Sequence, residues 1–173
     1  MTQHGPTRRA FLAGSAGLAT VLTATDSTAE DPPGLKSRFL FSMTADLEPP
    51  QNVGKVPEGG RMVFYAKGGS LEGPRIKGTV LPGGGDWYRR RSDGVGVLDV
   101  RASFKADDDS IVYVHYTGYS HNQTPDKSTY FRVLPKFETA SEKYDWLNRI
   151  LAVGVWKPSP GPSQVSYDVY EIL

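Results

Sequence analysis

The sequence predicts an all-β fold, a single closed antiparallel β-barrel of about 8–10 strands with one short helix. Glycine and proline clusters divide the chain into short apolar runs roughly ten residues apart, which is typical of antiparallel strands joined by tight turns. Within several runs apolar and polar residues alternate, as in a strand with one buried face. The last run can pair with the first, and this pairing would close the sheet.

Segments that alternate in this way, or that carry continuous apolar residues between turn signals, are predicted to be strands. In the first of them the apolar side chains fall on one face, at Phe39, Phe41, Met43, Ala45 and Leu47. In chain order the predicted strands are residues 38–47, 61–66, 71–81, 87–91, 95–105, 111–118, 130–134, 150–156 and 165–172.

Turn and loop residues separate these strands. The prolines and glycines of residues 48–60 predict a long loop, because proline cannot donate to a strand ladder. Ser92-Asp93-Gly94 is a strong hairpin signal. Further turns are predicted at 68–69, 82–85 and 106–109, a bulge or bend at 73–74, and a polar loop at the barrel mouth at 119–129.

One short helix is predicted at residues 142–149, near the C-terminal third of the chain. Thr139-Ala-Ser-Glu142 matches a capping box, in which the first and last side chains bond to the backbone at the helix start. A helix of this length is not stable alone, so it depends on packing Tyr144, Trp146 or Leu147 against the barrel.

The first 29 residues are predicted to be an export signal. Thr7-Arg-Arg-Ala-Phe-Leu12 fits the twin-arginine pattern, and the apolar run that follows is too short to span a bilayer. Ser27-Thr-Ala29 supplies small residues for cleavage. We therefore expect residues 1–29 to be removed, 30–36 to form a polar lead-in, and 37–173 to form the barrel of a periplasmic or secreted protein without stable membrane insertion.

The composition argues against several classes of function. The chain has 20 Lys and Arg and 19 Asp and Glu, whereas nucleic-acid binding usually needs a basic excess. The basic run Arg89-Arg90-Arg91 is interpreted as a solvated strand end. The absence of cysteine excludes thiolate chemistry, and three histidines are too few for a His-based zinc site. We expect no metal and no cofactor, since no cofactor motif is present.

A series of glycine-rich and aromatic motifs runs through the chain from Gly59 onward. They are Gly-Gly-Arg (59–61), Gly-Gly-Ser-Leu-Glu-Gly-Pro-Arg-Ile-Lys-Gly (68–78), Val-Leu-Pro-Gly-Gly-Gly-Asp-Trp (80–87), Asp-Gly (93–94), Leu-Asp-Val-Arg (98–101), Tyr-Phe-Arg (130–132), Phe-Glu-Thr (137–139) and Tyr-x-Trp-Leu-Asn (144–148). With these motifs the chain resembles a family of uncharacterised small β-barrel proteins, domain of unknown function 3237. The resemblance implies a closed barrel with an interior of small-molecule size, and no established reaction.

Two neighbouring charged residues, Asp99 and Arg101, point to the same side of a predicted strand. From the pattern alone they form a solvent-facing ion pair, which contributes little to stability. Both belong to the family-like motifs, and this implies that they face the lumen, where a charge must be paired or hold a ligand. We then expect Asp99 to act as an acid or base and Arg101 to stabilise developing negative charge. His115 is interpreted as a structural or surface histidine.

A further carboxylate, Asp86, follows the glycine-rich turn before Trp87. It is interpreted either as an Asx-type turn residue that accepts local backbone N–H bonds, or as a catalytic general base with a raised pKa. Arg61 either holds an anionic group or pairs with a nearby carboxylate. Trp87, Tyr116 and Asn148 are predicted ligand-binding groups, because small-ligand pockets combine aromatic walls with a few polar anchors.

These observations predict an exported barrel that binds a small aromatic or oxygenated organic molecule in its lumen. A catalytic version assigns Asp86 or Asp99 as the acid or base of a cofactor-free cyclisation, isomerisation or lyase step. The alternatives are a periplasmic ligand carrier without turnover and an envelope protein-interaction module, which would use an exposed apolar patch. The sequence does not distinguish these possibilities, and it does not indicate the oligomeric state.

Overall fold

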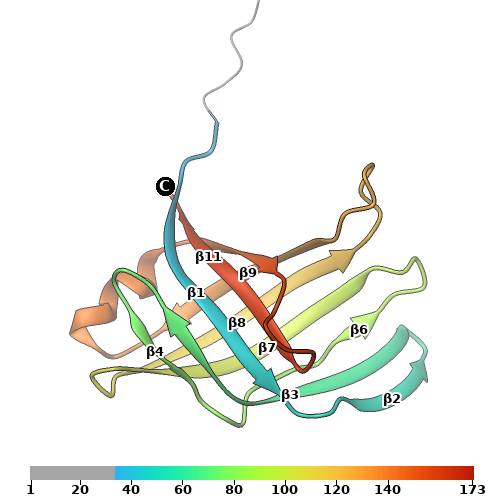
Figure 1. Cartoon of the computed structure of the whole chain (residues 1–173), viewed down its shortest axis with the longest axis horizontal. Coiled ribbons are helices and arrows are strands. Elements are labelled where there is room, and N and C mark those ends of the chain that lie inside the picture. Colours follow the sequence, from blue (N-terminus) through green and yellow to red (C-terminus); the bar gives the residue numbers. More distant parts are fainter. Residues whose placement is uncertain (1–33) are drawn as a thin grey trace, which may run out of the picture. The chain divides into compact units, whose positions relative to one another are not determined.

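The computed structural model describes residues 34–173, whose strands form one antiparallel sheet closed into a barrel (Figure 1). Strand β1 pairs with β11 on one side and with β3 on the other, which closes the ring. β4, β5 and β6 share one position between β3 and β7, so the barrel is eight-stranded. The strands are β1 Ser37–Leu47, β2 Gln51–Val56, β3 Gly59–Glu72, β4 Lys77–Val80, β5 Gly85–Asp86, β6 Arg89–Arg90, β7 Gly96–Ala106, β8 Ile111–His121, β9 Tyr130–Glu138, β10 Ala152–Lys157 and β11 Gln164–Ile172. The predicted fold class is confirmed.

The region around Gly68 and Gly69 differs from the sequence-based prediction. β3 continues through both glycines, where a turn was expected, and the register against β1 shifts between Asp46 and Leu47. A β-carbon on Gly69, whose φ is 145°, would lie 2.2 Å from the Thr44 carbonyl oxygen. The glycines therefore allow a bulge and a close backbone approach instead of ending the strand.

The next two motifs are also reassigned by the structure. Gly73-Pro74, expected as a bulge within one strand at 71–81, forms the turn between β3 and β4, where the Gly73 N–H donates to the Ile76 carbonyl at 2.9 Å. The expected loop 48–60 contains β2, which pairs with β3. β2 is compatible with the prolines there because Pro49, Pro50 and Pro57 lie outside its bounds.

The helix forms at the predicted residues, as the 3₁₀ helix η1, Glu142–Arg149. The capping box is wrong: the N-cap is Ser141, without a side-chain cap bond. Thr139 instead accepts the Ser141 N–H at 3.1 Å and donates to the Ile111 carbonyl at 2.8 Å. Packing stabilises the helix, since the side chains of Tyr144 and Leu147 are buried.

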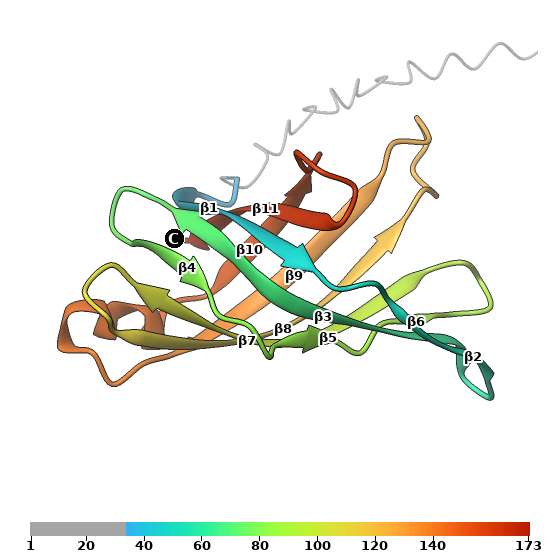
Figure 2. The same cartoon turned by 60° about the horizontal axis from the view of Figure 1, so that its bottom comes forward.

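The two ends of the barrel are different. η1 lies at one end, and the loop after β8 lies at the opposite end with the β6–β7 hairpin (Figures 1 and 2). The half nearer η1 is filled by aromatic side chains: the Phe41 ring packs edge-to-face on Phe104 and Phe137 at centroid distances of 6.1 and 6.0 Å. These rings narrow the interior at that end, and we call the opposite end, on the side of the loop, the mouth.

The export signal expected at residues 1–29 and the first part of the lead-in lie outside the described residues. Within residues 34–173, no helix has both the length and the apolar character that a bilayer crossing requires.

Candidate functional site

An apolar cavity of about 280 Å³ lies inside the barrel. Aliphatic and aromatic side chains from β1, β3, β7, β8, β9 and β11 form its walls. Polar groups enter the lining at Asp86, Tyr88, Tyr116, Ser120 and Tyr167, and no lysine or arginine of the described chain takes part. The lumen is therefore largely apolar, whereas the sequence led us to expect a hollow with inward-facing carboxylate and guanidinium groups.

Asp86 is the carboxylate of this lining. It lies on β5, between Phe64 of β3 and Val100 of β7 in the register, and its Oδ1 accepts the Asp99 N–H at 3.1 Å. This bond joins neighbouring strands, so it is not the local Asx-turn bond. Burial raises the pKa of Asp86 to about 6, and the nearby Asp99 charge adds to the increase, while the Asp99 N–H bond and Arg61 oppose it. Asp86 can consequently gain or lose a proton near neutral pH.

Two buried tyrosines lie in the wall with Asp86. The rings of Tyr116 and Tyr167 meet edge-to-face with centroids 6.0 Å apart. Burial raises the pKa of both hydroxyls well above the usual range, with smaller contributions from the Asp86 charge. Both therefore remain neutral hydrogen-bonding groups. Tyr116 lies in the lumen, as the sequence led us to expect of a ligand-binding residue.

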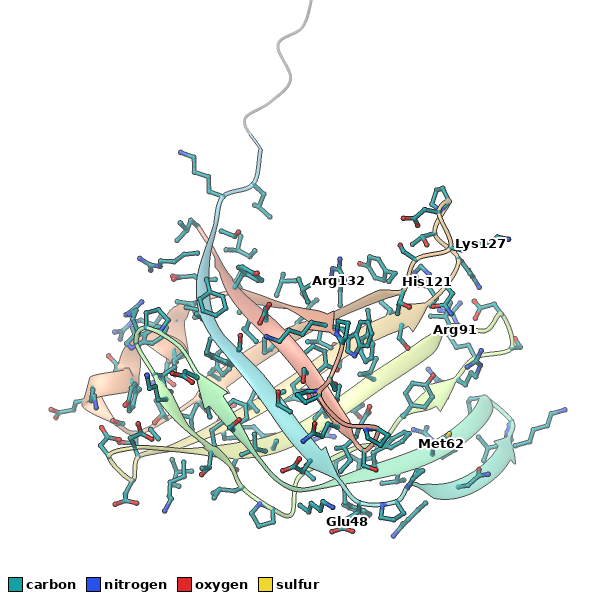
Figure 3. All side chains as sticks on the ribbon, viewed as in Figure 1. Glu48, Met62, Arg91, His121, Lys127 and Arg132 are labelled. Carbon is teal, nitrogen blue, oxygen red and sulfur yellow. The ribbon has the colours of Figure 1, made fainter. Side chains whose placement is uncertain are left out.

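A second hollow, of about 510 Å³, lies at the mouth and shares Tyr88, Ser120 and Phe131 with the inner cavity. Its outer wall includes His121 and Trp156, and the Trp156 ring stacks on Phe131 with centroids 6.1 Å apart. Figure 3 shows His121 at this end of the barrel, close to Arg91 and to the loop that carries Lys127. The two hollows therefore adjoin at these three residues, and the outer one is open to solvent.

Asp99 and Arg101 do not face the lumen, so the orientation implied by the resemblance is wrong. Their neighbours Leu98 and Val100 line the cavity, which places the charged side chains on the outer face. The Asp99 carboxylate accepts a hydrogen bond from Arg101 at 3.0 Å and lies 3.2 Å from His115 Nε2. The helix lies at the barrel end, and the apolar face of β7 surrounds the lumen.

Arg61 and Trp87 also lie on the outer face. Arg61 donates to the Trp87 carbonyl, and the Arg101 guanidinium lies 5.6 Å from the centre of the Trp87 ring. The structure thus brings Arg61, Trp87, Asp99 and Arg101 together, but outside the wall that carries Asp86. The backbone N–H of Asp99 donates to Asp86 and so connects the outer face of the wall with the lumen.

Asn148, expected at the lumen or mouth, lies at the opposite end of the barrel in η1. Its side chain accepts the Thr139 N–H at 2.8 Å and donates to the Thr139 carbonyl at 2.9 Å, which fixes the helix to the end of β9. It is not part of the cavity lining. Its placement therefore supports a structural role and does not support the predicted ligand contact.

Several lining residues escaped the sequence-based interpretation: Phe64, Tyr88, Ser120, Phe131 and Tyr167. Each occupies a position that alternates with an outward residue, so strand alternation was the signal that could have found them. Residues 34–173 contain no cluster of three His, Asp or Glu side chains arranged to hold a metal ion.

Comparisons with known proteins identify relatives over nearly all of the described chain. The family model described as protein of unknown function (DUF3237) matches residues 35–172. The UPF0311 protein RPA1785 of Rhodopseudomonas palustris is 29% identical over 153 residues, which cover 82% of this chain and 99% of that protein. A crystal structure of a beta-barrel like protein from Acinetobacter baumannii has a TM-score of 0.74 and 30% identity, and the match covers 83% of this chain and 99% of the other.

The name of one more distant relative states a reaction. The hydroalkoxylation enzyme phnH of Penicillium herquei is 28% identical over 139 residues, which cover 80% of this chain and 83% of the enzyme.

Proposed function

We propose that this chain, which belongs to the family described as protein of unknown function DUF3237, is a cofactor-free enzyme that adds a substrate hydroxyl group across a carbon–carbon double bond inside the barrel. The observation that carries the proposal is Asp86, a carboxyl group with a pKa of about 6 in an apolar cavity. The name of the Penicillium relative supports the reaction class.

Hydroalkoxylation forms one C–O bond and one C–H bond, while the π bond of the alkene and the O–H bond of the hydroxyl break. The reaction consumes no electrons and releases no leaving group, so it needs no redox cofactor. Its requirement is a proton donor for the alkene carbon and a proton acceptor for the hydroxyl. An acid–base group whose pKa lies near the working pH meets both needs.

In the proposed mechanism the neutral Asp86 carboxyl donates its proton to one carbon of the double bond. The hydroxyl oxygen of the same substrate then attacks the neighbouring, cationic carbon and closes a ring. The Asp86 carboxylate takes the hydroxyl proton and is restored to its acid form. The N–H of Asp99 holds one carboxyl oxygen in place through this cycle.

The cavity walls suit a cationic transition state. The aromatic side chains of Phe64, Tyr88, Phe131 and Tyr167 are part of the lining, and aromatic rings can stabilise a nearby positive charge. Among residues 34–173, no lysine or arginine that would repel the cation takes part in the lining. An apolar cavity also keeps bulk water away from the cationic carbon, so that the substrate hydroxyl captures it.

Asp99 and Arg101, expected as catalytic residues, act through Asp86 in this proposal. Arg101 bonds to the Asp99 side chain on the outer face, and the Asp99 N–H bonds to Asp86 across the wall. They are positioning residues, because neither side chain reaches the cavity.

Binding in the lumen is tested by filling the cavity. Ala102→Phe places a phenyl ring in the space that Ala102 now borders, and we expect at least a tenfold weaker affinity, about 1.4 kcal/mol, for 2-prenylphenol, a probe with both a hydroxyl and an alkene. Calorimetric titration measures the affinity. Ser103→Phe, on the opposite face of the same strand, is the matched control and should bind like the wild type. Equal affinity of Ala102→Phe and the wild type would contradict lumen binding.

Export by the twin-arginine route is the second part of the proposal, and it is supported by the Arg8-Arg9 motif. The full chain, expressed in a bacterium with this pathway, should be recovered from the periplasm or the medium. The double variant Arg8→Lys and Arg9→Lys should remain in the cytoplasmic fraction. Export would be disproved by cytoplasmic recovery of the wild type.

A further inference from the structure

A separate hollow of about 460 Å³ lies on the outer face of the barrel, across strands β3, β6, β7 and β8. It is lined by Arg61, Trp87, Arg89, Asp99, Arg101 and His115, none of which lines the inner cavity. We call it the outer groove. The proposed reaction in the lumen makes no use of a ligand there.

Positive charge dominates the outer groove. Three guanidinium groups and one imidazole lie around one carboxylate, Asp99, which is already occupied by Arg101 and His115. Within the described residues, Arg61 and Arg89 form no ion pair, and the one hydrogen bond from the Arg61 side chain goes to a neutral carbonyl. Arg61 and Arg89 occupy paired positions on neighbouring strands, so their charges repel one another, and a bound anion would relieve this repulsion.

The groove also has a flat apolar surface. Trp87 is 36% exposed, and the Arg101 guanidinium lies 5.6 Å from the centre of its ring. A planar ring can stack on an exposed indole, while a guanidinium group binds a carboxylate through two parallel N–H bonds. Both features together match a planar molecule with a negative charge at one edge.

We propose that the outer groove binds a small aromatic carboxylate, with its ring on Trp87 and its carboxylate between Arg61 and Arg89. The groove and the lumen lie on opposite sides of the barrel wall, so binding in the groove can be followed separately from the reaction at Asp86. Two control ligands separate the two features of the proposed molecule. Inorganic phosphate has the negative charge without the ring, and benzyl alcohol has the ring without the charge.

The test is an NMR titration of the full chain with benzoate, in which the indole N–H signals report on each tryptophan. We expect a saturable shift of the Trp87 signal, and at least about tenfold weaker binding in Arg89→Ala and in Arg61→Ala. Benzyl alcohol and phosphate should each bind at least about tenfold more weakly than benzoate. Arg61→Ala removes a bond to the backbone, so Arg89→Ala, which removes none in the described chain, remains decisive if the first variant unfolds.

A second arginine–tryptophan pair provides the matched control. The Arg75 guanidinium lies 3.6 Å from the centre of the Trp146 ring, away from the outer groove, and benzoate should leave the Trp146 signal unchanged. Equal shifts at Trp146, binding unaffected by Arg89→Ala, or phosphate binding as tight as benzoate would each overturn the proposal. Ala102→Phe, which fills the lumen, should bind benzoate like the wild type, and this separates the outer groove from the lumen.

Discussion

Replacement of Asp86 by Asn is expected to lower the turnover of 2-prenylphenol by about 10²–10⁴-fold, the usual contribution of a positioned acid–base group. The amide cannot donate a proton to the alkene carbon or accept one from the hydroxyl, yet it has nearly the same size and can still accept the Asp99 N–H. The cyclic ether product, separated by chromatography, measures the rate. Affinity for the probe should change little, because the cavity shape is kept.

The wild-type rate should also fall as the pH rises, because Asp86 must be protonated to start the reaction. The acid form donates the first proton, and its population decreases as the pH rises through about 6, so the rate should fall about tenfold per unit above that value. Asp126→Asn, in an exposed loop, is the matched control and should match the wild type. If the wild type binds the probe but forms no cyclic ether at any pH, the protein is a carrier and not an enzyme.

The second large effect is a pH-dependent gain in stability from the same substitution. The folded-state pKa of Asp86, about 6, lies above its ordinary value of 3.8, so the folded protein keeps a proton that the unfolded chain has lost. The contribution of Asp86 to stability therefore decreases as the pH rises from about 4 to about 6 and stays low above that. Two pKa units correspond to about 3 kcal/mol.

Urea unfolding of the wild type and Asp86→Asn measures this difference. The two proteins should be nearly equal in stability at about pH 4, and Asp86→Asn should be more stable by about 2–3 kcal/mol at about pH 8. Groups such as Asp108, whose pKa is lowered by its hydrogen bond to Lys143, give pH dependence of the opposite sign. They are present in both proteins and cancel in the comparison. A difference that does not vary with pH would show that folding does not raise the pKa of Asp86.

The barrel itself was predictable, because short-range patterns specify strands and turns. Alternation identified β1 and β11 and allowed their pairing, which the register from Ser37 with Ile172 to Asp46 with Gln164 confirms. The Ser92-Asp93-Gly94 turn also forms as expected, with Gly94 at a φ of 84°. The prediction failed at Gly68 and Gly69. Glycine is common both in turns and in β-bulges, and only the pairing with the neighbouring strand decides which of the two forms.

The candidate site was only partly predictable. Asp86 and Trp87 were both assigned to a ligand site, although adjacent residues of a strand point to opposite faces. Asp86 lies in the lumen and Trp87 on the outer face. Asn148 was predicted to be a polar anchor of the pocket, but its contacts with Thr139 are structural. A motif indicates that residues occur together in the sequence and does not indicate which surface they reach.

The sequence by itself determined the all-β class, the closure of the last strand on the first, and the fact that Asp99 and Arg101 share one side of a strand while Leu98 and Val100 share the other. Only the tertiary structure decided which side is the lumen. The physical reason is that a period of two separates the two faces of a strand without identifying the inner one. That choice depends on what each face packs against, and here the helix covers the barrel end and leaves the apolar face of β7 to enclose the cavity.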